Sequence, residues 1–459
     1  MLDRVRELVT AATSCLNRRL SVGRFHSLPG RRSTSINPRP SSVAQRLSET
    51  CAIVAVLFLC ATKQGGQPLT SHRTVSLWVS ACALISVGLA LASPSQHTVP
   101  IPQYVVDPLW PKQLPHNWIL GQIAGLAVDS HDHVWVLHRA RSLTADELGA
   151  TQTPPRSECC VPAPAVLELD AQGRLVGAWG GPGYVPDWPK NEHAIWVDRE
   201  GHVWIGGNGS GDRQVLKFTT DGHLLLEIGH PSEVPADNRD TRILGQPAGI
   251  QVDDATHEVF IADGYLNNRI VVFDSDTGQF KRGWGAYGIP LGEIVTPPAP
   301  EQSNSAPKSD HSTEYRPGGS LDKQFRTPVH CARLSADGFV YVCDRRNDRI
   351  QVFTRQGQFV KEFLVHPATL GNGSVWTVEL SHDTRQQYLL VADGEDNVIW
   401  ILNRDDGTVV SSFGHNGRNA GQFHWVHQTA VDSHGNFYSG EVDTGKRIQK
   451  FLLSKSAHD

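Results

Sequence analysis

The chain has 459 residues and a formal net charge of −5, so its charge balance indicates neither a nucleic-acid partner nor a general membrane-surface partner. Glycine (42) and tryptophan (12) are abundant and methionine occurs once, which favours a turn-rich β protein over a helical one rich in Ala, Leu, Glu and Lys. An all-β architecture is therefore the first expectation.

Residues 1–74 form an N-terminal region of low complexity. Residues 17–48 are rich in Arg, Ser and Pro, and the short apolar stretch "CAIVAVLFLCA" follows at 51–61. A segment with so little apolar periodicity cannot bury enough apolar surface to offset the entropy cost of ordering the chain. We expect this region to be disordered.

Residues 75–92 form a signal peptide or a membrane anchor. A basic flank, an apolar run and the small pair Ala90 and Ala92 match a secretory signal with cleavage after Ala92. Alternatively, the run is about long enough to span a bilayer. Both alternatives export the following domain, to a periplasmic, extracellular or outward-facing anchored location, with membrane contact only through this segment. A translation start nearer residue 70 would bring the signal to the N-terminus, and it would need an alternative start codon because Met1 is the sole methionine.

Six copies of one sequence unit account for most of residues 120–453. Each begins with a strand, an Asx or Ser turn and a second strand, as in "EHAIWVDREGHVWIGGN", and most continue with two more strands, as in "IVVFDSDTGQFKRGWG". Such spacing predicts four-stranded antiparallel meanders. Because one sheet cannot bury both faces, the units are expected to close into a six-bladed β-propeller over residues 101–453.

Two segments depart from the repeat. The last copy stops after its third strand, at "RIQKFLL", so residues 101–112 are expected to supply its outer strand. Residues 287–325 are rich in Pro, Ser and Gly without a strand pattern, and we expect a loop over one mouth of the channel.

Among the cysteines of the exported part, Cys331 and Cys343 lie on consecutive expected strands and could form a bridge, although sequence alone does not assign the pairing.

Histidine recurs in alternate units. Aligned on the turn after the first strand, the units carry at one position Ala124, His193, Ala248, His330, Trp376 and His427. The first strand of each blade lines the channel, so alternate blades place three imidazoles about 120° apart around the axis. Three neutral nitrogens with an open fourth position are the ligand set of a catalytic zinc site. The alternative is that these histidines are hydrogen-bonded packing residues at strand starts.

A second set of residues follows the second strands, at the same mouth: Arg139, Tyr265 and Arg345. Two guanidiniums near a metal favour a substrate with a carboxylate, and a tyrosine beside a dication can act as a base. The alternative for each arginine is an ion pair with an acid of a neighbouring blade. A further set of arginines recurs with the repeat and is assigned to structure: Arg269, Arg349 and Arg447.

With these residues identified, the chain resembles the NHL-repeat propellers through "DGYLNNRIVVFDSDTGQF" and "DRRNDRIQVFTRQGQFVKEF". Within that group it is most similar to the peptidyl-α-hydroxyglycine α-amidating lyase family, which cleaves a carbinolamide to a peptide amide and glyoxylate. The resemblance implies a zinc ion held by three histidines, a catalytic tyrosine in "DGY" and arginines for the substrate carboxylate. The residues at those positions are His193, His330 ("TPVHCARL"), His427 ("HWVHQTAV"), Tyr265, Arg139 and Arg345.

Three positions depart from that family. Gln428 stands where the family has an aspartate that helps to hold a structural calcium, which puts that calcium in doubt. Trp425 replaces a methionine, and Leu266 replaces a cysteine that forms a disulfide in the family. The pocket therefore differs close to the metal, which bears on the substrate more than on the chemistry.

The leading hypothesis is a zinc-dependent lyase, similar to peptidylglycine-amidating enzymes, that acts on a small-molecule or peptide carbinolamide with a carboxylate. The second hypothesis is a non-catalytic NHL propeller that binds a peptide, protein or glycan, which needs only a rigid ring and variable loops. A calcium-dependent hydrolase or lactonase propeller would use Asp, Glu and Asn around the channel, and the alternating histidines argue against it. The natural substrate and the oligomeric state are not indicated.

Overall fold

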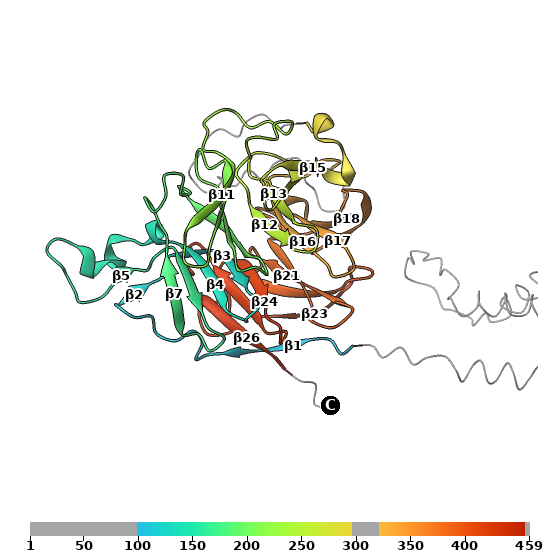
Figure 1. Cartoon of the computed structure of the whole chain (residues 1–459). Helices are drawn as coiled ribbons and strands as arrows, with labels where there is room; N and C mark the ends of the chain where they lie inside the picture. Colours follow the sequence, from blue (N-terminus) through green and yellow to red (C-terminus); the bar gives the residue numbers. More distant parts are fainter. Residues whose placement is uncertain (1–98, 296–320, 455–459) are drawn as a thin grey trace, which may run out of the picture. The chain divides into compact units, whose positions relative to one another are not determined.

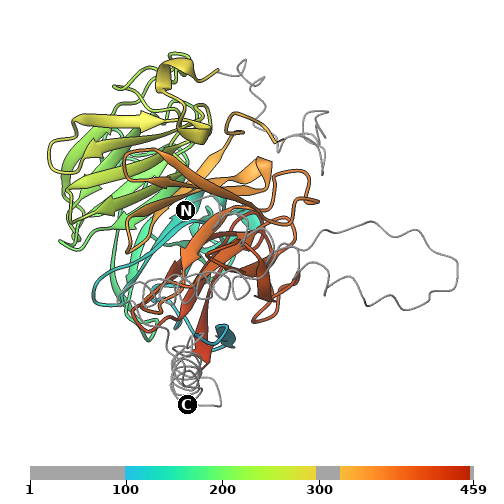
Figure 2. The same ribbon diagram turned by 90° about the vertical axis from the view of Figure 1, so that its right-hand side faces the viewer.

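The computed structural model describes residues 99–295 and 321–454, which form a six-bladed β-propeller (Figure 1, Figure 2). The chain divides into two units, Met1–Gln96 and His97–Asp459, and every described residue belongs to the second. The predictions for residues 1–74, for residues 75–92 and for most of the insertion at 287–325 therefore lie outside the described residues. Within the described ranges, no helix is long and apolar enough to cross a membrane.

Five blades are consecutive antiparallel meanders, ordered from the channel outward. The strands of the first two blades are β3 (Gln122–Val128), β4 (Val134–Arg139), β6 (Val166–Leu169) and β7 (Leu175–Trp179), then β8 (Glu192–Val197), β9 (Val203–Gly207), β10 (Gln214–Phe218) and β11 (Leu224–Gly229). Those of the third and fourth are β12 (Gly249–Asp253), β13 (Glu258–Asp263), β14 (Arg269–Asp274) and β15 (Phe280–Trp284), then β16 (Val329–Leu334), β17 (Phe339–Asp344), β18 (Arg349–Thr354) and β19 (Phe359–Leu364). Those of the fifth are β20 (Thr377–Leu380), β21 (Tyr388–Asp393), β22 (Val398–Asn403) and β23 (Val409–Phe413).

The sixth blade joins the two ends of the propeller. Its strands are β24 (Val426–Val431), β25 (Phe437–Glu441), β26 (Ile448–Ser454) and, outermost, β1 (Gln103–Asp107). β1 pairs antiparallel with β26 over its whole length, from Gln103 opposite Ser454 to Asp107 opposite Lys450. The expectation that residues 101–112 supply the missing outer strand is confirmed. The inner strands contact one another in ring order, and β24 contacts β3, so the ring is closed.

Short elements connect the strands. Two residues of β2 (Trp118–Ile119) pair in parallel with β5 (Val161–Pro162). The 3₁₀ turns of the described chain are η1 (Ala140–Ser142), η2 (Ala145–Glu147), η3 (Gly149–Thr151), η4 (Ala286–Gly288), η5 (Leu291–Glu293) and η6 (Arg345–Asn347). Of these, η1 and η6 follow second strands, where functional side chains are expected.

Apolar side chains fill the spaces between neighbouring blades. Trp135 and Leu137 of the first blade pack with Ile205 of the second, and Phe260 of the third packs with Val340 of the fourth. All five side chains are completely buried. Burial of this kind supplies the main favourable free energy of folding, so the channel itself can carry polar groups.

The repeating arginines pair with buried acids, as the sequence predicts for structural residues. The second strands of three blades end in an acid that meets such an arginine: Asp263 with Arg269 at 2.8 Å, Asp344 with Arg349 at 2.7 Å, and Glu441 with Arg447 at 2.8 Å. The fifth blade breaks this pattern, because Val398 lies opposite the fully buried Asp393. The Asp393 carboxylate instead accepts hydrogen bonds from the backbone N–H groups of Glu395 and Asp396 and from the indole of Trp400.

The cysteines of the propeller form two bonds. Cys331 and Cys343 lie directly opposite each other on β16 and β17 and form a disulfide with a Cα–Cα distance of 4.9 Å. The sequence indicated this bridge as a possibility, because the two cysteines lie on consecutive expected strands. Cys159 and Cys160 are bonded to each other in the loop before β5.

Replacing Asp393 with asparagine should weaken the pH dependence of stability. Burial above all, and then the carboxylates of Asp396 and Asp348, raise the pKa of Asp393 to about 7 from its ordinary 3.8. The folded state thus binds this proton more tightly than the unfolded state, so the free energy of unfolding falls as pH rises from about 4 to about 7. The Asp393→Asn variant should show a shallower fall between pH 5 and pH 8 in urea unfolding. Equal pH dependence in parent and variant would contradict this account.

Candidate functional site

A β-bulge aims each of the three predicted histidines into the channel. His193, His330 and His427 are the second residues of β8, β16 and β24, which are the inner strands of alternate blades. In each strand the pairing register with the second strand shifts across the histidine, which is left without an opposite residue. A bulge bends the strand and redirects the extra side chain. The repeat register predicted which residues meet, and the bulges bring them together.

The three imidazoles converge on one point. The centroids of the rings are 4.8 to 5.1 Å apart, and one nitrogen of each ring lies within 4.8 Å of the others. His193 Nδ1 lies 2.9 Å from the Ala248 carbonyl, and His330 Nδ1 contacts the Trp376 carbonyl. Because a carbonyl only accepts, both Nδ1 atoms carry the proton, and both Nε2 lone pairs face the centre.

The environment keeps these histidines neutral. All three are at most 3% exposed. Burial above all, followed by the neighbouring imidazoles and arginines, holds the pKa of His193, His330 and His427 well below the ordinary histidine value. A neutral imidazole is the form that binds a metal ion.

A metal ion fits this donor set. His427 Nε2 lies 3.2 Å from His193 Nε2, so two ring nitrogens meet in the channel. Nitrogens that converge at this distance need a shared proton or cation between them. Three histidine nitrogens with an open position are the ligands that zinc takes in catalytic sites.

Tyr265 lies at the open side of the histidine cluster. It follows β13 by two residues, is half-buried, and places its hydroxyl 2.8 Å from His193 Nε2 and 3.4 Å from His330 Nε2. The phenol oxygen therefore lies next to the nitrogens that would hold an ion, where it could exchange a proton with a bound hydroxyl group.

Both predicted arginines lie at the same end of the channel. Arg139 ends β4, and its Nε donates to the Glu192 carbonyl at 2.7 Å while Nη1 donates to Gln122 Oε1 at 3.0 Å. Arg345 opens η6, and its Nε donates to the Asn372 carbonyl at 2.9 Å. Within the described residues, neither guanidinium forms an ion pair with a carboxylate, so the alternative of a neighbouring acid is not what holds them.

Sequence reasoning did not identify what orients Arg345. Its guanidinium carbon lies 4.4 Å from the centre of the Trp376 ring, and Trp376 occupies the fifth-blade position equivalent to the histidines. The Trp376 indole N–H donates to the Gly373 carbonyl at 2.8 Å, which fixes the ring. The sequence did contain a signal, because Trp376 is the one large residue among the three equivalent positions that lack histidine. Its contact with Arg345 could not be predicted, because Arg345 belongs to another blade.

Two other clusters of titratable side chains lie outside this site, and the first has a structural explanation. The groups Asp129, His133, Glu168 and His366, Asp393, Asp396 each bring three titratable side chains together. In the first, the Trp135 indole donates to Asp129, and the second blade repeats the arrangement with Trp204 and Asp198. This turn is therefore part of the repeat.

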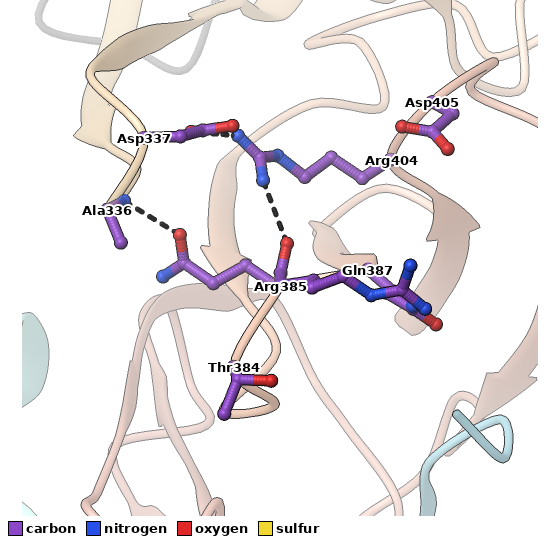
Figure 3. A pocket seen from close by; sticks show the side chains of 8 residues that line it. Ala336, Asp337, Thr384, Arg385, Gln387, Arg404 and Asp405 are labelled. Atoms are coloured by element: carbon purple, nitrogen blue, oxygen red, sulfur yellow. Dashed lines mark hydrogen bonds and ion pairs between the residues drawn. The ribbon is translucent and has the colours of Figure 1, made fainter. Parts of the chain in front are cut away.

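A crevice of about 500 Å³ lies between turns of the fourth and fifth blades, at the other end of the propeller from the histidines (Figure 3). The Arg404 side chain crosses it, donating from Nε to the Tyr341 hydroxyl at 2.6 Å and from Nη1 to the Arg385 carbonyl at 3.0 Å, and pairing with Asp337. These contacts join the two blades and occupy the guanidinium, so we assign the crevice to the junction between blades.

The chain is similar in sequence to amidating enzymes and to NHL-repeat proteins. It is 26% identical to peptidyl-glycine alpha-amidating monooxygenase B of Xenopus laevis over 361 residues, which are 74% of this chain and 35% of that protein. It is 23% identical to the probable peptidyl-alpha-hydroxyglycine alpha-amidating lyase pgal-1 of Caenorhabditis elegans, over 51% of this chain and 56% of that one. It is 28% identical to NHL repeat-containing protein 3 of Mus musculus, over 55% and 57% of the two chains.

The extent of these matches is limited. The chain spans about a third of the length of the Xenopus monooxygenase. No model of a known protein family matches it. Among solved structures, a streptogramin B lyase aligns with a TM-score of 0.44 and 14% identity over 76% of this chain and 98% of that chain, too distant a likeness to bear on function. The expected resemblance to amidating lyases and NHL propellers is confirmed at the level of sequence similarity and fold.

We predict that the purified chain binds one zinc ion through His193, His330 and His427. His330→Ala should weaken zinc retention by more than about 100-fold, because even loss of an outer-shell partner of a metal ligand costs about 10- to 100-fold. The matched control is His424→Ala, since His424 is half-buried near His427 but pairs with Asp443 instead. Metal analysis after dialysis, with circular dichroism to check the fold, measures the effect. Equal zinc content in parent and His330→Ala would rule out this site.

Proposed function

We propose that this chain is a zinc-dependent lyase that cleaves a carbinolamide substrate carrying a carboxylate, releasing an amide and glyoxylate or a related aldehyde acid. One observation carries the proposal. Two guanidiniums that form no ion pair with a carboxylate in the described chain lie at the same end of the channel as three neutral, converging imidazoles and a tyrosine hydroxyl. The Caenorhabditis relative is named as a probable lyase of this kind, and the Xenopus relative is named as an amidating monooxygenase.

The arginines would bind the substrate carboxylate. Each guanidinium is oriented through Nε by a backbone carbonyl, of Glu192 for Arg139 and of Asn372 for Arg345. One Nη of each also donates to a side-chain amide, of Gln122 and of Asn372, so the other Nη would meet a ligand. Burial lowers the pKa of both arginines, although an arginine side chain remains protonated in proteins. Two such cations favour an anion strongly and fix its orientation.

With the carboxylate at the arginines, the substrate hydroxyl would lie at the histidines and Tyr265. A zinc ion held there by His193, His330 and His427 would act as a Lewis acid and polarise the hydroxyl oxygen. Tyr265 lies within hydrogen-bond reach of that position and takes the hydroxyl proton. As the C–O bond becomes a carbonyl, the C–N bond breaks, and the leaving amide nitrogen gains one proton. The proton released equals the proton required, so the cleavage needs no co-reactant.

The alternative is a non-catalytic propeller that binds a peptide, protein or glycan. The NHL repeat-containing relative fits that class as well as the lyase class, because its name states no activity. A binding propeller would give no glyoxylate from any carbinolamide, which separates the two. Export of the chain remains a prediction under both the lyase and the binding hypothesis, since residues 75–92 lie outside the described residues.

Tyr265→Phe should abolish turnover while leaving zinc content unchanged. The substitution removes only the phenol oxygen, and proton transfer by a positioned side chain is worth about 10² to 10⁴ in rate. Glyoxylate release from an α-hydroxyglycine peptide measures kcat, with Tyr184→Phe as the control because Tyr184 is 44% exposed and away from the histidines. Full activity in Tyr265→Phe would place the base elsewhere, and an inactive parent would refute the lyase proposal.

Arg139→Ala should act on binding more than on the chemical step. Loss of a charge-assisted hydrogen bond to the carboxylate should raise KM by about 10- to 100-fold while kcat falls less. The control is Arg174→Ala, since Arg174 is exposed and pairs with Asp170. An unchanged KM with a large loss in kcat would instead assign Arg139 to the transition state.

A further inference from the structure

Trp425 is a half-exposed aromatic residue beside the candidate site. It precedes β24 and lies two residues before His427, which is only 3% exposed. Its ring meets Trp376 edge to face at a centroid distance of 5.4 Å, and the Trp376 ring lies 5.9 Å from His427 and 6.0 Å from His330. Trp376 itself is only 4% exposed, so the two rings form a continuous aromatic path from the buried imidazoles toward solvent, and Trp425 is its partly exposed end.

The backbone at Trp425 does not call for a tryptophan. Its φ is +52°, in the left-handed region that costs a bulky residue more than glycine or asparagine. The conformation is held by the Trp425 N–H donating to Asn397 Oδ1 at 2.6 Å and by its carbonyl accepting from the Val442 N–H at 3.0 Å. A smaller residue would make both hydrogen bonds with less strain. The large ring is thus explained neither by the turn nor by complete burial.

Trp376 links this surface to the arginine that would bind the carboxylate. The Arg345 guanidinium stacks 4.4 Å from the Trp376 ring centre, while Trp425 contacts the same indole. A carbinolamide carbon bears a hydroxyl, a carboxylate and an amide nitrogen. With the first at the histidines and the second at the arginines, the amide side must extend toward solvent, because the imidazoles close the inner end.

We propose that Trp425, held in place by the buried Trp376, forms an aromatic wall that binds a planar or large apolar group on the amide side of the substrate. This inference rests on the proposed function and narrows its substrate class to α-hydroxyglycines whose acyl group bears an aromatic or bulky apolar substituent. Aromatic rings pack favourably edge to face or offset, and burial of an apolar group removes surface from water. Trp425 is in this account a specificity-determining residue, and Trp376 positions both Trp425 and Arg345.

The test compares equilibrium binding of two uncleavable probes, benzoylglycine and acetylglycine, which share the carboxylate and amide and differ in the phenyl ring. By isothermal titration calorimetry, the parent should bind benzoylglycine at least about tenfold tighter. Trp425→Ala should reduce this ratio to about twofold or less, and Trp425→Phe should retain most of it. Trp118→Ala is the matched control, because Trp118 is also half-buried but lies on β2 among the core residues of the first blade.

No preference in the parent, or a preference that survives in Trp425→Ala with the melting temperature unchanged, overturns the proposal. The Phe variant guards against misfolding, since it keeps an aromatic ring on the same backbone. Glyoxylate release from the α-hydroxylated forms of both probes is measured separately. A silent release assay together with a Trp425-dependent binding preference would refute the lyase function and leave the aromatic wall standing.

Discussion

The convergence of six inner strands on one axis is the constraint on which the rest of this structure depends. Because each inner strand contacts the next and β24 contacts β3, equivalent residues of the repeat face a common centre. A residue type repeated in alternate units must then meet its copies in space. The bulge at each histidine strengthens this effect, since it turns the side chain from the sheet into the channel. A simple sequence period thus becomes a compact donor set.

The electrostatics of the channel follow from the same convergence. The imidazoles are buried where two guanidiniums point, and burial and charge both act to keep them neutral. Neither guanidinium of the site forms an ion pair with a carboxylate in the described chain, although the charges of Glu192 and Glu395 act on Arg139 and Arg345 from further away. Elsewhere in the fold, buried guanidiniums such as Arg269 and Arg349 each have an aspartate partner. This contrast between paired arginines in the scaffold and the two at the mouth supports the proposed binding role of Arg139 and Arg345.

Much of the fold and of the site geometry follows from the repeat, while contacts between blades do not. The strand pattern predicts the six blades, the missing outer strand and the meeting of His193, His330 and His427, because all depend on spacing within one unit. The stacking of Arg345 on Trp376 depends on how the fourth and fifth blades pack, which no local pattern encodes. Asp393 is a second example. The residue opposite it is Val398 instead of an arginine, and this is found only when the units are aligned strand by strand. The sequence pattern of one unit therefore does not predict how side chains of different units pack.

The pairing of β1 with β26 has a consequence for the order in which the protein matures. The first and last strands of the described chain lie side by side, so the contact of greatest sequence separation closes the ring. Contacts of this kind cost the most chain entropy and form slowly. The sixth blade, which bears His427, is incomplete until β26 has been synthesised and has met β1, the first strand of the propeller. The third histidine thus reaches its final surroundings only after the whole propeller has been translated, which delays assembly of the site until the chain is complete.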